Sequence, residues 1–214
     1  MEREIKCGRC GNQVLVSDEI HVNDFVTPRN YVEKAYFDLW HFPIQRCSHC
    51  NYAGVDISSD IGTEINLSEI LENPIIAKLK DARPNDIEDY LLAAATYESV
   101  GEQLLQAKCL LQAGDLCYDE AMYWRTYILD EDEDEEDYDD IIAMAQDLYE
   151  RGTSLLKDYV LNHPEDIDNR LLLIGVIQES GRTGRFESQI LIENLRKQAL
   201  TETQRVILEF LSKN

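Results

Sequence analysis

The stretch from residue 141 to residue 160 reads IIAMAQDLYERGTSLLKDYV, and its apolar side chains recur at intervals of three and four residues. That spacing places them along one face of an α-helix. The face consists of Ile141, Ile142, Ala145, Leu148, Tyr149, Gly152, Leu155, Leu156, Tyr159 and Val160. Asn162, His163 and Pro164 follow it, and a proline cannot continue a helix. The stretch therefore predicts a long amphipathic helix and favours a mainly α-helical fold.

Helical spacing extends to both sides of this stretch. Residues 87–97 carry one apolar stripe, with Asn85 at an N-cap position and Gly101 where the helix would stop. The other predicted helices span 102–129, 166–180, 186–198 and 201–212, and the last opens with the capping-box sequence Thr201-Glu202-Thr203-Gln204. Short connections favour antiparallel neighbours, so we expect stacked helical hairpins. An ordinary helix bundle has the same periodicity and stays open as an alternative.

The N-terminal part of the chain carries two C-x-x-C pairs. They are Cys7-Gly8-Arg9-Cys10 and Cys47-Ser48-His49-Cys50, separated by 36 residues. Each C-x-x-C turn brings two sulfurs close enough to share one ion, and two such turns complete a tetrahedral shell at ~2.3 Å. Gly11 and Asn51 directly follow the two pairs, where the backbone of a metal knuckle turns left-handed. The spacing predicts a structural Zn²⁺ held by Cys7, Cys10, Cys47 and Cys50 in a small β-rich zinc ribbon.

The cysteines have alternative interpretations, which are disulfide bonds, a redox pair and a zinc site in which histidine replaces one sulfur. Disulfides are disfavoured because the N-terminus lacks the apolar core of a secretory signal, which indicates a cytoplasmic protein with reduced thiols. A thioredoxin-like pair is disfavoured because neither C-x-x-C precedes an amphipathic helix. His49, His41 or His21 can replace one sulfur ligand, although four thiolates already complete the shell and leave no position for catalysis. Cys109 and Cys117 are expected to be buried core thiols.

The charge of the chain narrows the classes of function. Among 214 residues there are 20 Lys and Arg against 42 Asp and Glu, a formal charge of −22. Residues 1–60 contribute −3 and residues 61–214 contribute −19. A phosphate backbone needs a basic face, so nucleic-acid binding is not expected beyond weak binding by the ribbon. No apolar run approaches the ~18 residues of a membrane span. We expect a zinc-ribbon-like module over 1–57, a connector over 58–84 and a helical domain over 85–214.

Two further segments have a distinctive composition, one acidic and one aromatic. Residues 130–140 hold ten acidic side chains, and they predict a solvated loop inside the helical domain. Docking of a basic partner stays open as the functional alternative. A calcium loop is excluded because Glu135 stands at the position that requires Gly and Ile141 at the position that requires Glu. Residues 36–44 are rich in aromatic side chains and predict a strand that covers the second knuckle and packs onto the helices.

Several groups of residues resemble domain-of-unknown-function family 2225, an uncharacterised bacterial group. They are Cys7-Gly8-Arg9-Cys10-Gly11, Cys47-Ser48-His49-Cys50-Asn51-Tyr52-Ala53 and the Leu-Ile-Gly segment at 173–175. The family has Pro where Gly8 and Ser48 stand and Gly where Asn51 stands, and these departures keep all four ligands. Its paired arginines are missing here, because residues 175–181 read GVIQESG.

The resemblance implies two zinc knuckles followed by tetratricopeptide-like helices, and it implies no reaction. A tetratricopeptide unit of 34 residues wants a small residue in its first helix, Gly at the turn and Ala early in its second helix. Ala94 or Ala95 with Gly101, and Gly175 with Gly184, can be placed in this way, whereas Gln106 and Gln189 stand where Ala is expected. The repeats are therefore degenerate.

These observations together predict a non-enzymatic interaction or scaffold module. Stacked helical hairpins leave a concave groove, and such grooves bind proteins or peptides. The sequence shows no Ser-His-Asp or H-E-x-x-H pattern. The alternatives are a thiol-based redox protein, a zinc-dependent enzyme and a weak nucleic-acid-binding ribbon.

Overall fold

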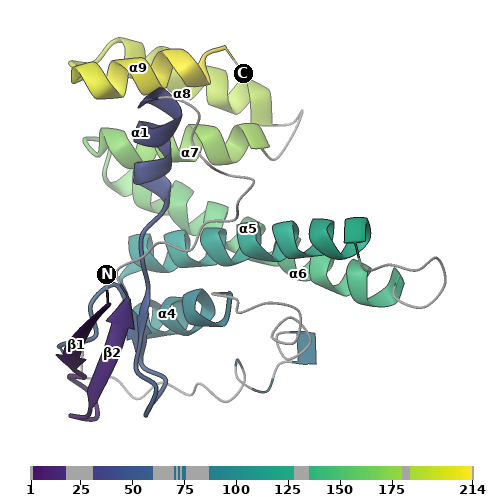
Figure 1. Cartoon of the computed structure of the whole chain (residues 1–214). Helices are drawn as coiled ribbons and strands as arrows, with labels where there is room; N and C mark the ends of the chain where they lie inside the picture. The colour runs from purple at the N-terminus through teal and green to yellow at the C-terminus, as the bar shows by residue number, and fades with distance from the viewer. Residues whose placement is uncertain are drawn as a thin grey trace. The chain divides into compact units, whose positions relative to one another are not determined.

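The computed structural model describes residues 2–17, 31–59, 70, 72, 74–75, 87–127, 135–179 and 184–213. These residues are mainly helical, with small antiparallel sheets near the N-terminus (Figure 1). The chain divides into two compact units, one made of residues 1–23 and 42–152 and the other of residues 24–41 and 153–214. The coarse fold prediction is thus confirmed: the protein is mainly α-helical with a small β-rich part at its start.

The first unit opens with two β-hairpins. Strand β1 (Glu2–Lys6) pairs antiparallel with β2 (Gln13–Ser17), and β3 (Gln45–Arg46) pairs in the same way with β4 (Ala53–Gly54). The side chains of β2 alternate as a half-buried strand should, with Val14 and Val16 buried and Leu15 63% exposed. A small apolar core lies beneath the hairpins and consists of Cys7, Val14, Val16, Cys47, Tyr52 and Ile57.

Three helices complete the first unit: α4 (Ile87–Val100), α5 (Gln103–Tyr127) and the first part of α6 (Glu135–Asn162). Helices α4 and α5 pack as a hairpin whose turn contains Gly101 at φ +73°. The sequence predicted all three helices and the stop at Gly101, and these predictions are confirmed. The predicted cap at residue 85 lies outside the described residues.

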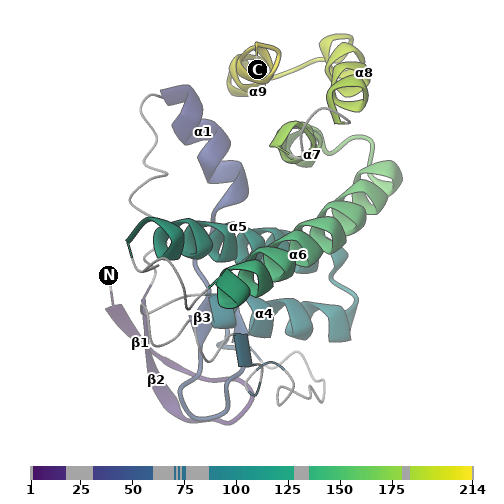
Figure 2. The same ribbon diagram turned by 90° about the vertical axis from the view of Figure 1, so that its right-hand side faces the viewer.

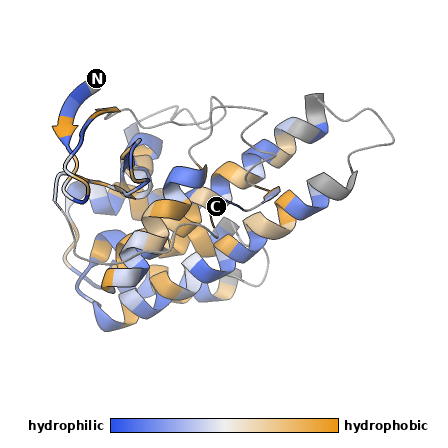
Figure 3. Ribbon diagram, turned by 90° about the horizontal axis from the view of Figure 1, so that it is seen from below, coloured by the Kyte–Doolittle hydropathy of each residue, from blue (hydrophilic) through white to orange (hydrophobic). Residues whose placement is uncertain are grey.

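Glycine allows α5 and α6 to approach closely. A Cβ atom added to Gly152 of α6 would lie 2.7 Å from the Cγ of Leu111 on α5. The hydroxyl of Tyr149 on α6 donates a hydrogen bond to Asp115 of α5 nearby. Apolar and polar segments alternate along the long helices in Figure 3, as expected for helices that each bury one face.

The second unit is built from α1 (Tyr31–Trp40), the last turns of α6, α7 (Ile167–Glu179), α8 (Gly184–Arg196) and α9 (Glu202–Leu211). Figure 2 views α7, α8 and α9 close to end-on. Their shared core consists of Leu171, Ile174, Ile192, Leu195, Ile207, Leu208 and Leu211. The predicted capping box is present, because Thr201 Oγ1 accepts from the N–H of Gln204 and Gln204 Oε1 accepts from the N–H of Thr201. Helices α7, α8 and α9 confirm the last three predicted helices.

The predicted strand over residues 36–44 is wrong, because residues 31–40 form helix α1. Ala35, Tyr36 and Leu39 lie at helical spacing and pack on the core of α7–α9, so tertiary contacts outweigh the β propensity of the aromatic side chains. The ring of Tyr36 occupies the space beside Gly175 that a Cβ atom would need. Residues 36–40 therefore pack onto helices, as expected, but they do so as a helix.

The acidic run also differs from its prediction. Residues 135–140 form the first turns of α6 and are not a loop, while residues 130–134 lie outside the described residues. The expected connector over 58–84 lies mostly outside them as well. The expected ranges 1–57, 58–84 and 85–214 stay a prediction, and α1 packs with α7 and α9 in the second compact unit. None of the described helices is both long enough and apolar enough to cross a membrane.

Candidate metal centre

The two β-hairpins bring four sulfur atoms together. Cys7 and Cys10 lie in the turn between β1 and β2, and Cys47 and Cys50 lie in the turn between β3 and β4. The Sγ atoms all lie within 4.8 Å of one another, with Cys7–Cys50 at 3.8 Å and Cys10–Cys47 at 3.6 Å. Sulfurs at ~2.3 Å from a tetrahedral ion are about 3.8 Å apart, so this group fits one ion in four-thiolate coordination. All six cysteines are free thiols, which leaves the four available as ligands.

The backbones of the two knuckles match one another. Gly11 and Asn51 have φ values of +75° and +58°, so the predicted left-handed residues are confirmed. The N–H of Gly11 donates to the carbonyl of Cys7 at 2.9 Å, and the N–H of Asn51 donates to the carbonyl of Cys47 at the same distance. A second hydrogen bond in each knuckle runs from the N–H of the first cysteine, from Cys7 to the carbonyl of Asn12 and from Cys47 to the carbonyl of Tyr52. Each local sequence thus folds its ligand pair into the same turn.

The thiols differ in exposure and in acidity. Cys7 and Cys47 are fully buried, whereas Cys10 is exposed. The backbone N–H of Asn12 points at the sulfur of Cys10 and lowers its pKa to about 6. Burial raises the pKa of Cys50 to about 12, and burial also raises that of Cys7. In the absence of metal, Cys10 is the thiol among these three that ionises first.

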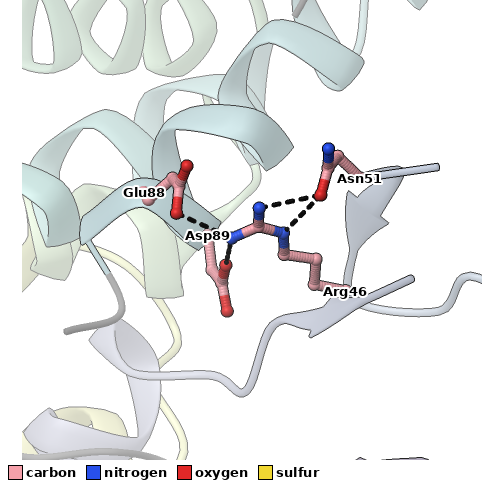
Figure 4. A network of polar contacts seen from close by, with 4 residues as sticks. All are labelled: Arg46, Asn51, Glu88 and Asp89. Atoms are coloured by element: carbon pink, nitrogen blue, oxygen red, sulfur yellow. Dashed lines mark hydrogen bonds and ion pairs between the residues drawn. The ribbon is translucent and has the colours of Figure 1, made fainter. Parts of the chain in front are cut away.

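A polar network at the second knuckle was not foreseen from the sequence (Figure 4). The guanidinium of Arg46 donates from Nε and Nη2 to Asn51 Oδ1 at 3.2 and 2.8 Å. Its Nη1 pairs with Glu88 Oε2 at 2.8 Å and with Asp89 Oδ1 at 2.9 Å. Burial alone would lower the pKa of Arg46, but hydrogen bonds to the two carboxylates raise it. The only local signal was an arginine directly before the first cysteine of the pair.

Two tyrosines of α4 add to the contacts of this hairpin. Tyr97 Oη accepts from the N–H of Val55 at 2.8 Å, and Tyr90 Oη donates to the carbonyl of Phe42 at 2.7 Å. A Cβ atom on Gly54 would lie 3.1 Å from Tyr97 Oη, so the glycine lets the strand approach the helix. The second knuckle is therefore docked on α4 by side chains at both ends of the β3–β4 hairpin.

The remaining candidate residues fall elsewhere. Among the described residues, the group that meets at one point contains the four cysteines and neither His49 nor His41. His41 stacks on Phe37 with ring centroids 3.7 Å apart, and burial lowers its pKa to about 4. His21 lies outside the described residues. Cys109 and Cys117 are fully buried in α5, as predicted, and burial raises the pKa of both thiols.

Comparison with known proteins identifies no relative of this chain. No family model matches the chain, no curated protein matches it and no solved structure matches its fold. The resemblance to family 2225 stays a prediction from the residues quoted above. The site consequently stands on its geometry, which is that of a centre able to hold one metal ion in a shell of four thiolates.

Proposed function

We propose that the protein is a non-enzymatic interaction module whose N-terminal ribbon is held together by a structural Zn²⁺ ion. The observation that carries the proposal is the convergence of four cysteine sulfurs, with cross-knuckle distances of 3.6 and 3.8 Å. Four thiolates complete a tetrahedral shell, so the ion has no open position for a substrate. The ribbon has a small core, and metal binding supplies folding free energy to such modules.

The choice of zinc rests on ligand chemistry. Tetrahedral four-sulfur sites select zinc or iron among the common metals. Protein purified from cells grown with both metals is expected to contain one zinc per chain and no absorption in the visible range. Iron at stoichiometric level, or protein that remains free of both metals after zinc is added in excess, would contradict the proposal.

The interaction role is supported by apolar side chains on outer helix faces. Phe186 and Ile190 lie one turn apart on α8 and are 74% and 46% exposed. Helical repeat proteins bind proteins or peptides through exposed side chains of this kind. We expect a photo-cross-linking residue placed at 186 to capture one partner reproducibly in cells. The same residue at exposed Glu150 is the control, and equal capture at both positions would contradict a specific surface.

A second candidate is a thiol-based redox function of the same centre. It is favoured by Cys10, which is exposed and whose sulfur lies 3.6 Å from that of Cys47. Peroxide would oxidise the two thiols to one disulfide, with both oxygens of the peroxide leaving as water and the ion released. Mild peroxide should then release zinc, and a thiol reductant with zinc should restore it. Zinc that stays bound under peroxide removes this candidate.

A further inference from the structure

The side chain of Arg46 forms hydrogen bonds across the turn that carries the ligands of the second knuckle. Arg46 directly precedes Cys47 and Asn51 directly follows Cys50, so the bond between their side chains joins the two ends of the ligand turn. Asn51 holds a left-handed backbone, which is unfavourable for a residue with a Cβ atom. Two hydrogen bonds from one guanidinium to the Asn51 amide oxygen stabilise that residue in the conformation that the metal site needs.

The same guanidinium fastens the turn to helix α4. Glu88 and Asp89 lie in the first turn of α4, and the Glu88 side chain is only 6% exposed. The Arg46 side chain is 24% exposed, so water screens the Arg46–Glu88 pair only weakly. Loss of Arg46 would leave a buried carboxylate without this cation, which is strongly unfavourable. The turn and the start of α4 are therefore held by one shared group.

The first knuckle supplies an internal comparison. Lys6 precedes Cys7 as Arg46 precedes Cys47, and Gly11 follows Cys10 as Asn51 follows Cys50. Gly11 has no side chain to accept a hydrogen bond, and the Lys6 stem lies over it, 3.7 Å from where a Cβ atom would be. The equivalent positions thus share a backbone but not the side-chain lock.

We propose that Arg46 is a positioning residue of the metal centre, which holds the second knuckle ready for the ion and couples metal occupancy to the docking of β3–β4 on α4. This inference rests on the proposed zinc centre. Outer-shell hydrogen-bond partners of metal sites contribute roughly 10–100-fold to metal affinity. Coupling between two equilibria is reciprocal. If docking of β3–β4 on α4 through Arg46 raises the metal affinity by some factor, metal binding raises the docking equilibrium constant by the same factor.

The test uses the full chain and Co²⁺ as the probe, since cobalt in a tetrahedral thiolate site absorbs visible light. Competition with a chelator gives the affinity. Hydrogen exchange of the amides of residues 91–94, which donate to the carbonyls of the first turn of α4, gives the docking equilibrium with and without metal. Arg46→Ala and Asn51→Gly are expected to weaken Co²⁺ binding by roughly 10–100-fold, and Lys6→Ala by less than about threefold. The protection of α4 gained on metal binding should fall by a matching factor in the first two variants.

Asn51 has a left-handed backbone and accepts hydrogen bonds from Arg46, and Asn51→Gly separates these two roles. Glycine adopts a left-handed backbone more easily than asparagine, so a role limited to the turn predicts unchanged or tighter binding. Arg46→Lys keeps a charge near Glu88 but cannot reach both Asn51 and the carboxylates, and it should bind Co²⁺ as weakly as Arg46→Ala. Variants that stay helical and bind as tightly as the natural chain overturn the role of Arg46. A natural chain that binds no Co²⁺ overturns the metal centre itself.

Discussion

The two knuckles share a backbone and differ in what holds it. In both, the residue after the second cysteine is left-handed and its N–H donates to the carbonyl of the first cysteine at 2.9 Å. The first knuckle relies on Gly11, whereas the second uses Asn51, Arg46 and the carboxylates of α4. One turn is thus permitted by a glycine and the other is held by a side-chain network. The ribbon is therefore braced unequally, with the exposed ligand Cys10 in the less supported knuckle.

The largest expected effect comes from removing a ligand. Cys7→Ser and Cys47→Ser should each abolish stoichiometric zinc, because all four sulfurs complete one shell, and the loss should exceed the roughly 100-fold effect of an outer-shell partner. Metal content after dialysis and chelator competition measure the loss. Cys109→Ser is the matched control, since Cys109 is a buried thiol of α5 outside the group. Retained zinc in either ligand variant would break the assignment of a shared site.

Thiol reactivity gives the next effect and sharpens the comparison between knuckles. In metal-free protein the pKa of Cys10 is about 6 and that of Cys50 about 12, so at pH 7 mainly Cys10 is a thiolate. A thiolate of low pKa is also a weaker nucleophile, and the two effects together leave Cys10 about 100-fold more reactive. Alkylation with iodoacetamide followed by mass spectrometry measures both rates. Cys10 alkylation should fall as the pH drops below about 6, and equal rates at pH 7 would contradict the account.

A change in the second compact unit tests whether the effects on the metal are local. Gly175→Ala places a methyl group where the end of the Tyr36 side chain lies, so that side chain or α1 must shift, at a cost of about 1–3 kcal/mol of unfolding free energy. Urea unfolding followed by circular dichroism measures that loss, and Co²⁺ affinity should be unchanged. Tyr36→Ala in the Gly175→Ala background should remove the clash and leave little further effect of the alanine. Weaker metal binding in Gly175→Ala would contradict the local brace described for the knuckles.

The smallest effect is expected at the far end of the docked hairpin. Tyr97→Phe removes the acceptor of the Val55 N–H, and the lost hydrogen bond should cost about 1 kcal/mol. Tyr90→Phe, which removes the bond to the Phe42 carbonyl, should behave in the same way. Both should reduce metal affinity less than Arg46→Ala, because neither contacts the ligand turn. An effect of Tyr97→Phe equal to that of Arg46→Ala would show that docking alone positions the ligands.

The metal group and most helices could be predicted because their signals are local. Two C-x-x-C pairs with Gly11 and Asn51 specify two turns, and apolar spacing with the capping box at Thr201 specifies the helices. Such signals lie within a few residues of the structure that they determine. The two turns lie 36 residues apart, and their convergence was expected only because a tetrahedral ion needs both pairs of sulfurs.

What could not be predicted depends on partners distant in the sequence. Residues 36–40 are aromatic and read as a strand, but α1 forms because Tyr36 and Leu39 pack on α7 and α9, more than 120 residues away. Arg46 lies 42 residues before Glu88, and nothing near either residue indicates the pair. The acidic composition of residues 135–140 predicts a solvated loop, but these residues form the first turns of α6.

X-ray absorption at the zinc edge of the purified full chain shows whether four cysteine sulfurs bind one zinc ion. Four sulfur neighbours at ~2.3 Å and one zinc per chain are the expected result, because Cys7, Cys10, Cys47 and Cys50 are the group of ligands that meets at one point among the described residues. A shell containing nitrogen or oxygen, fewer than four sulfurs, or no zinc at stoichiometric level would contradict it.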